Sequence, residues 1–371
     1  MIPVAATAKL ATIAKCTFVL FAALVAIQAN WRTPPSQGGI AILAAAPAGA
    51  PLDVARVLAA RYPENATMSY ISALSWSSAI RLTTLTSEPR WKEKARQQML
   101  PFIAGEKDSA PGERSLTSLA GYFALFDLGE DAPARKAAEL ILSTDQAEII
   151  RFAHGWTDDM FMAASLLARV ATRKLDDPYS RAVSRLLTTY AAKLQRPDGL
   201  FIHAADAPYA WGRGNGFAAL ALVEALTHLP ESWPDRPRVL EIYRRHMIAL
   251  ARYQSSDGSW RQVVDDYASY HELTVTAMTI AAMARGVRSG WLTRWFAPNI
   301  DRGWAAVVAR LGADGTLRGV CSGTAAGPTK EYYLTRPVIN GADDRGGAMA
   351  LLAAVEIEEL KRSMIRPLGG P

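Results

Sequence analysis

The sequence predicts an all-α fold: an (α/α)6 barrel of six inner and six outer helices, preceded by a signal segment. Three observations predict it. Helical apolar periodicity recurs about twelve times after residue 50, strand signals are few, and charged helices alternate with almost uncharged ones. A helix that is apolar on every side is buried on every side, whereas an amphipathic helix covers it. Repeated alternation therefore describes an inner ring of helices inside an outer ring.

Composition narrows the functional class. The chain has 371 residues, of which 50% are apolar and 20% charged, and this excludes disordered, collagenous and coiled-coil proteins. The net charge of +6 is not clustered, so no nucleic-acid partner is expected, but it favours an anionic small substrate. Two cysteines cannot build a disulfide scaffold or a Cys-rich zinc site, and the five histidines lack metal-ligand spacing. We expect no metal and no organic cofactor.

Residues 1–50 are interpreted as a signal peptide and linker, and residues 51–371 as a single catalytic barrel domain. Lys9 and Lys15 precede an apolar run over residues 17–27, which is typical of a secretory signal and too short to span a bilayer comfortably. Because a second apolar stretch follows, cleavage is expected either near residue 29 or near residues 46–50. An uncleaved anchor is the alternative. The sequence predicts an exported protein, periplasmic or secreted, with no stable membrane span after processing.

The helices follow one another with Pro, Gly, Asn and Asp punctuation between them. Charged, amphipathic members such as 235–252 alternate with members whose bodies are almost uncharged, such as the segment from Leu273. The best strand signal is 316–321. An open helical solenoid would share the alternation, but no fixed sequence period supports it. The expected starts are Leu52, Thr67, Pro89, Ser115, Asp131, Thr157, Asp177, Gly212, Pro234, Ser269, Pro298 and Asp343.

Polar residues gather at the predicted N-termini of the inner helices. Because all inner helices of such a ring run the same way, these N-termini meet at one rim, where their dipoles suit a carboxylate-bearing ligand. N-capping alone explains Asp158 or Asp343 taken singly, but the coincidence across four helices favours a site. The residues are Trp156, Asp158, Asp159, Trp211, Arg213, Asn215, Tyr270, Glu272, Asp343, Asp344 and Arg345.

Several segments carry a family resemblance. They read HGWTDDMFMAASLLA from His154, GLFIHAAD from Gly199, WGRGNGF from Trp211, YHELTVTAM from Tyr270 and GVCSGT from Gly319. In this order they resemble the unsaturated glycuronyl and unsaturated rhamnogalacturonyl hydrolases of glycoside hydrolase families 88 and 105. The resemblance covers roughly residues 68–359 and implies the same (α/α)6 barrel. It also implies removal of a Δ4,5-unsaturated uronic acid from the non-reducing end of lyase-generated oligosaccharides, by hydration of the enol ether.

The resemblance also implies residue roles. Asp158 matches the catalytic aspartate, which acts as general acid and base. A proton donor to carbon must hold its proton near neutral pH, which requires burial or a neighbouring negative charge, and the Trp156 ring is the expected apolar wall. A guanidinium suits a substrate carboxylate, which is the role expected of Arg213. Together with the rim pattern, the expected substrate-binding residues are Trp156, His203, Trp211, Arg213, Asn215, Tyr270 and Glu272.

The sequence departs from the family at two places. Relatives usually carry a second acid near the start of the second inner helix, where this chain has Ser115 and Ser118, with Glu113 the nearest acid. The family's C-terminal Asn-Asp-His-Gly is replaced by ADDRGG around Asp344. Two alternatives therefore stay open. One is an inverting glycosidase on saturated oligosaccharides, with Asp158 paired to Glu272 or Asp344. The other is a non-catalytic sugar-binding barrel.

Overall fold

A computed structural model describes residues 49–108, 114–142, 149–171 and 177–365, which belong to one unit spanning residues 45–371. Almost all of the predicted signal segment, residues 1–48, lies outside the described residues. Among the helices that are described, none combines the length and the apolar character that a bilayer span requires.

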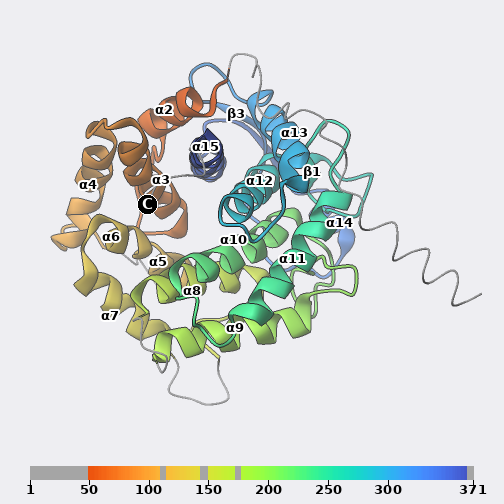
Figure 1. Ribbon diagram of the computed structural model, residues 1–371, viewed down its shortest axis with the longest axis horizontal. Helices are drawn as coiled ribbons and strands as arrows, with labels where there is room; N and C mark the ends of the chain where they lie inside the picture. The colour runs from red at the N-terminus through yellow and green to blue at the C-terminus, as the bar shows by residue number, and fades with distance from the viewer. Residues whose placement is uncertain (1–48, 109–113, 143–148, 172–176, 366–371) are drawn as a thin grey trace, which may run out of the picture. The chain divides into compact units, whose positions relative to one another are not determined.

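Two concentric sets of helices make up the fold (Figure 1). The inner set is α3 (Tyr70–Thr86), the pair α5 (Leu116–Ala120) and α6 (Phe123–Leu128), α8 (Thr157–Val170), α10 (Gly212–His228), α12 (Leu273–Arg288) and α15 (Asp344–Ile365). The outer set is α2 (Pro51–Arg61), α4 (Arg90–Ile103), α7 (Asp131–Ile141), α9 (Pro178–Leu194), α11 (Arg236–Arg252) and α13 (Ala297–Val308), the last preceded by the short 3₁₀ helix η1 (Arg294–Phe296). Contacts between α15 and α3 close the inner ring, so the predicted (α/α)6 barrel is confirmed.

Burial explains why the two sets differ in sequence. Every residue of α10 from Gly212 to Leu226 is buried, whereas only one face of the outer helix α11 is buried. Small residues let the inner helices approach closely. A Cβ added at Gly216 would lie 2.7 Å from the Met278 sulfur of α12, and one added at Gly347 would lie 2.2 Å from the Tyr62 ring. Close packing of this kind leaves room for few alternatives to glycine.

The second inner helix is broken, although one continuous helix was expected from Ser115. The chain makes short i→i−3 hydrogen bonds at Gly121 and Tyr122, between α5 and α6. At Gly121 it runs against the backbone that leads into α3, since an added Cβ would lie 2.7 Å from the Ser69 nitrogen. Local periodicity does not encode the close approach of a neighbouring backbone, and this is why one continuous helix was expected.

Two antiparallel hairpins complete the structure in the described part of the chain. Strand β1 (Trp260–Arg261) pairs with β2 (His271–Glu272), and β3 (Leu317–Cys321) pairs with β4 (Val338–Gly341). The strand expected over 316–321 is thereby confirmed as β3. The short helix α14 (Lys330–Leu334), which the sequence analysis did not predict, lies between β3 and β4.

A buried ionic cluster lies toward the C-terminal ends of the inner helices. Arg285 of α12 donates to Glu224 of α10 at 2.6 Å and to Glu356 of α15 at 2.7 Å, and Arg81 of α3 reaches Glu356 at 2.6 Å. Arginines at helix C-termini complement the negative end of the helix dipole. The cluster thus ties inner helices together at the end opposite their N-termini.

Candidate active site

The N-terminal ends of the inner helices meet through backbone contacts between distant segments. The Thr157 amide at the start of α8 donates to the His203 carbonyl at 3.0 Å, and the Gly212 amide at the start of α10 donates to the Gln262 carbonyl at 2.7 Å. The Cys321 amide of β3 donates to the Glu272 carboxylate, just before α12, at 2.9 Å. The mouth expected from helix direction therefore exists, and it brings Asp158, His203 and Arg213 into one region.

Asp158 presents its carboxylate at this mouth. It is the second residue of α8, and its side chain is 15% exposed. Its Oδ2 atom lies 3.1 Å from Nε2 of His203, which is fully buried. The Trp156 ring packs beside the histidine with ring centroids 5.5 Å apart. The aspartate is therefore accessible on one side and supported by an imidazole and an indole on the other.

A tyrosine orients the histidine. Nδ1 of His203 lies 2.8 Å from the Tyr333 hydroxyl, which also accepts a hydrogen bond from the Gly327 amide at 3.0 Å. Burial raises the pKa of Tyr333 to about 12, so the phenol keeps its proton. We assign the tautomer from this network: Tyr333 donates to Nδ1, and Nε2 then carries the hydrogen that is donated to Asp158.

Asp159, unlike its neighbour, has its carboxylate buried inside the protein. Its Oδ2 atom accepts hydrogen bonds from the amides of His154, Gly155 and Trp156 at 2.7–3.0 Å and from the Tyr190 hydroxyl at 2.9 Å. Burial raises the pKa of Asp159. This carboxyl group holds the loop that carries Trp156, so its contribution to the site is structural.

Trp211 and Arg213 lie beneath the mouth, each 2% exposed. The Trp211 ring packs on His203 with centroids 4.4 Å apart, and the Arg213 guanidinium carbon lies 5.5 Å from the Trp211 ring centroid. Arg213 Nη2 donates to the Cys321 carbonyl. Both residues support the floor under His203. Their direct contact with a substrate stays a prediction.

Asn215 and Glu272 are fully buried and fully engaged with backbone groups or neighbours. The Asn215 amide bonds to both backbone groups of Phe201 and to the Trp211 carbonyl at 2.8–2.9 Å. Glu272 caps α12 by accepting from the Val275 amide at 2.7 Å and binds β3 through its other oxygen. Both residues hold neighbouring segments in position. Neither has an accessible polar atom that could make the expected contact with a substrate.

Tyr270 is half-buried, and burial together with the neighbouring Cys321 raises the pKa of its phenol. Its contact with a substrate also stays a prediction. The second acid of the family has no counterpart among the described residues of the α5 region, because Ser115 caps α5 and its hydroxyl accepts from the Ser118 amide at 3.4 Å. Glu113 lies outside the described residues.

Two tyrosines of the mouth were missed by the sequence analysis. Tyr333 lies on the short helix α14, in a connecting segment whose sequence shows no helical period. It is 130 residues away in sequence from its partner His203. Tyr70 is the first residue of α3 and is buried, and this burial raises the pKa of its phenol. Its place at an inner-helix N-terminus was the signal that would have found it.

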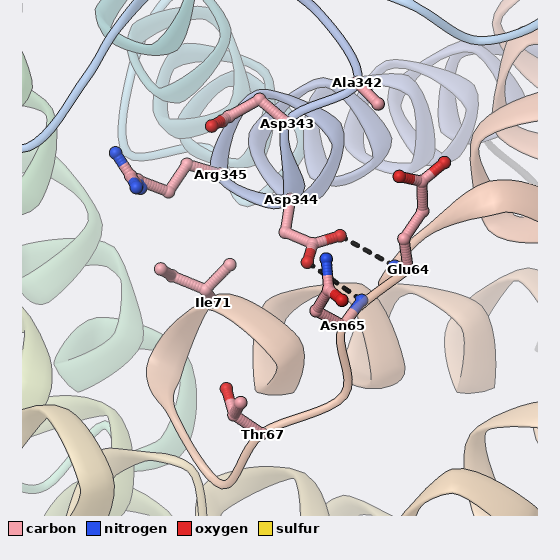
Figure 2. A pocket seen from close by; sticks show the side chains of 8 residues that line it. All are labelled: Glu64, Asn65, Thr67, Ile71, Ala342, Asp343, Asp344 and Arg345. Atoms are coloured by element: carbon pink, nitrogen blue, oxygen red, sulfur yellow. Dashed lines mark hydrogen bonds between the residues drawn. The ribbon is translucent and has the colours of Figure 1, made fainter.

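The last inner helix contributes a pocket of about 310 Å³ next to this region (Figure 2). Asp344 accepts from the amides of Glu64 and Asn65 at 2.7 and 3.0 Å, and thus fastens the loop before α3 to the start of α15. Asp343 caps α15 through the Gly346 amide at 2.8 Å. Nowhere in the described part of the chain do three potential metal-ligating side chains converge on one point.

Comparison with known proteins adds to this geometry. The family model described as Glycosyl Hydrolase Family 88 matches residues 62–361. The chain belongs to glycosyl hydrolase family 88. The family resemblance drawn from the sequence is thereby confirmed.

Two curated relatives of this family 88 chain carry related names. The chain is 30% identical over 190 residues to the unsaturated 3S-rhamnoglycuronyl hydrolase of Alteromonas sp. (strain LOR). The aligned segment covers 47% of this chain and 46% of that protein. The chain is 27% identical over 203 residues to the unsaturated rhamnogalacturonyl hydrolase YesR of Bacillus subtilis (strain 168). This aligned segment covers 53% of this chain and 57% of that protein. The matched segments thus span about half of each relative.

Solved structures agree on the fold. A possible GH105 family member from Klebsiella pneumoniae superposes with a TM-score of 0.74 at 18% identity, covering 89% of this chain and 98% of that one. The unsaturated glucuronyl hydrolase of Bacillus sp. GL1 superposes with a TM-score of 0.60 at 13% identity, covering 82% and 94%. At these identities the likeness supports the barrel alone.

Proposed function

We propose that this family 88 barrel removes a Δ4,5-unsaturated uronic acid from the non-reducing end of lyase-generated oligosaccharides by hydrating the enol ether. The observation that carries the proposal is the Asp158 carboxyl group, accessible at the mouth and hydrogen-bonded to His203 at 3.1 Å. Family membership and the names of the Alteromonas and Bacillus relatives support the same substrate class.

In the first step the Asp158 carboxyl group gives its proton to C4 of the unsaturated ring. The double bond supplies the electron pair of the new C4–H bond, and positive charge develops over C5 and the ring oxygen. The Asp158 carboxylate that remains is stabilised by the Nε2–H of His203, which lies 3.1 Å away, and by the N-terminal dipole of α8. Tyr333 contributes by keeping the histidine in the tautomer that donates.

In the second step water adds to C5, and its proton returns to the Asp158 carboxylate, which restores the acid. The product is a hemiketal at C5. It opens by breaking the bond from C5 to the ring oxygen, and C1 then carries both a hydroxyl and the remaining sugar chain. Collapse of that hemiacetal expels the chain as an alcohol, so the overall reaction consumes one water.

The inverting-glycosidase alternative requires a second accessible carboxylate about 6.5–9.5 Å across the cleft. Its two candidates are already occupied: Glu272 caps α12 from a fully buried position, and Asp344 binds two backbone amides. This geometry disfavours the alternative. A non-catalytic sugar-binding barrel is the second candidate, and the serines at Ser115 and Ser118, in place of the family's second acid, are the observation that favours it.

A panel of lyase-generated unsaturated disaccharides, each paired with its saturated counterpart, tests the proposal. Enol-ether hydration destroys the ultraviolet absorbance of the double bond, so we expect absorbance loss with the unsaturated member of a pair and no reaction with the saturated one. Cleavage of saturated chains would support the inverting glycosidase. Oligosaccharide binding without turnover of any panel member would support the non-catalytic barrel.

A further inference from the structure

The outer helix α11 carries much of the positive charge of the chain. It holds five arginines and one glutamate, a formal charge of +4, against +6 for all 371 residues. The expectation that the charge is unclustered is therefore wrong on this wall, because the helix turns its apolar residues inward and its arginines outward. The exposed residues of α11 are Pro237, Arg238, Glu241, Arg244, Arg245, Ile248 and Arg252.

Three of these arginines form a row along the helix. Arg238, Arg245 and Arg252 follow one another at intervals of seven residues, which is close to two helical turns, so they share one face and lie about 10.5 Å apart along the axis. The row runs toward the mouth. The C-terminal end of α11 is bonded to β1 through the Trp260 Nε1 atom, which donates to the Leu250 carbonyl at 2.7 Å, and β1 pairs with β2 directly before α12.

No carboxylate of the described residues neutralises this face. None of its arginines has a carboxylate oxygen within 4.0 Å, and Glu241, the one acid of the helix, forms no ion pair with them. Where these arginines bond inside the protein, the acceptor is neutral. Arg244 donates to the Trp291 carbonyl at 2.8 Å, and Arg245 donates to the side-chain oxygen of Gln195. The charge of the face is therefore directed to the outside.

The surrounding wall makes this face distinctive. Helix α9 packs beside α11 (Figure 1), and its sequence contains three basic residues and no acidic one. Helix α4 is also rich in basic residues, but there the charges are paired with acids. Arg90 lies 2.5 Å from Glu88, and Arg96 lies 3.3 Å from Glu93. An external anion therefore meets unpaired guanidinium groups on α11 and paired ones on α4.

The chemistry of the face favours one class of anionic partner. A guanidinium is a planar fork that matches a carboxylate. A polyuronate, which is a polysaccharide built with uronic acids, repeats the carboxylate along a line, and two of its sugars span a length comparable to seven residues of α-helix. A bilayer surface is matched less well. A helix that lies in a membrane surface needs an apolar face toward the lipid, and Ile248 is the one large apolar residue among the exposed residues of α11.

We propose that the arginine row of α11 is an accessory binding surface for the polyuronate from which lyases release the substrate oligosaccharides. This inference rests on the proposed function for the identity of the polymer. The surface lies on the outer wall, so a bound polymer leaves the mouth free. Tethering the barrel to the polymer raises the local concentration of unsaturated chain ends without any new contact in the site.

Binding to a saturated polymer tests the surface without turnover. The probe is polygalacturonate, and its fully methyl-esterified form is the neutral counterpart. We expect the wild type to bind the acid and not the ester, with an affinity that falls as salt screens the charges. The row variant, which combines Arg238→Gln, Arg245→Gln and Arg252→Gln, should bind roughly 3- to 100-fold more weakly, the range of three exposed ion pairs. Lysine at the same positions should retain part of the affinity, because it keeps the charge and loses the fork.

A matched control removes the same charge from another outer helix. It combines Arg90→Gln, Lys92→Gln and Arg96→Gln on α4, all of which are exposed, and it should bind as the wild type does. An equal loss in this control would overturn the proposal, since net charge and not the row would then attract the polymer. A wild type that binds no polyuronate, but binds phosphatidylglycerol vesicles or duplex DNA, would overturn it as well and would assign the face to another partner.

Disaccharide kinetics separate this inference from the proposed function. A disaccharide has no polymer chain to bind on the wall, so the row variant should keep the wild-type kcat and KM on it. Weaker polygalacturonate binding with unchanged disaccharide kinetics and melting temperature would support the surface. If the wild type hydrates no disaccharide, the proposed function fails, while the binding comparison still decides whether this wall holds a polyuronate. Unchanged binding by the row variant would refute the inference even if the wild type were an efficient hydrolase.

Discussion

Replacing Asp158 with asparagine separates the proton from the shape of the side chain. The amide has nearly the same size, and its oxygen can still accept the Nε2–H of His203 at 3.1 Å. It has no proton to give to C4. The side chain is 15% exposed and caps no backbone group, so the change should cost about 1 kcal/mol or less of the free energy of unfolding.

The expected loss of activity is much larger. A positioned general acid contributes about 10²- to 10⁴-fold, which corresponds to roughly 3–5 kcal/mol in the activation barrier. We expect kcat of Asp158→Asn to fall by at least about a hundredfold. KM should change little, because the amide preserves the contact surface. Initial rates of absorbance loss on an unsaturated disaccharide, with a thermal melt of the same preparation, measure both quantities.

Asp159→Asn is the matched control, one residue along the same helix. Its Oδ2 atom serves four donors inside the protein, so the substitution should lower the free energy of unfolding by about 1–3 kcal/mol. Turnover should fall less than tenfold, as the loop carrying Trp156 loosens. Near-wild-type activity of Asp158→Asn, or a greater kcat loss in well-folded Asp159→Asn, would refute the assignment.

Three further expectations concern other parts of the chain. Tyr333→Phe removes the hydroxyl 2.8 Å from His203 and should lower kcat about tenfold with little effect on KM; an unchanged kcat would show that the histidine needs no orienting partner. Burial alone would raise the pKa of Glu356, but Arg285 and Arg81 hold it near 2, against 4.5 for an ordinary glutamate. The stabilisation linked to ionised Glu356 should therefore be complete above pH 4.5 and be lost as the pH falls toward 2. Melting curves of Glu356→Gln should be less stable at pH 7 and flatter across that interval, and an equally steep acid loss in the variant would contradict this. Expressed with its native N-terminus in a Gram-negative host, the chain should leave the cytoplasm and lose roughly 29–50 residues, whereas a full-length cytosolic product would argue against export.

Most of the fold could be predicted because its signal is local. Each expected helix start lies within four residues of an observed one, from Leu52 to Asp343. Burial on one face or on all faces is written in the 3.6-residue period of each segment, and the alternation of the two types specifies the rings. The break after Ala120 was not predicted, because it lies against the backbone that leads into α3.

The candidate site could be predicted only as far as chain direction allows. Parallel inner helices bring their N-termini to one rim, so the segments of Asp158 and Glu272 had to meet there. Which side chains face the opening is a different question. Asp158 and Asp159 are adjacent in sequence, yet one is accessible and the other is buried among amide donors. Consecutive residues on a helix point about 100° apart, so the packing of the helix decides between them.

The sequence alone therefore determined the barrel, the family and the ring of polar residues around one mouth, because all three follow from local periodicity and from motifs read in order. Tertiary structure alone decided the roles within that ring. It buried Arg213 against a carbonyl, directed Arg345 to the Ser322 carbonyl, and brought Tyr333 to His203 across 130 residues. The burial and the hydrogen-bond partners of a side chain are set by segments distant in sequence, and no local pattern carries that information.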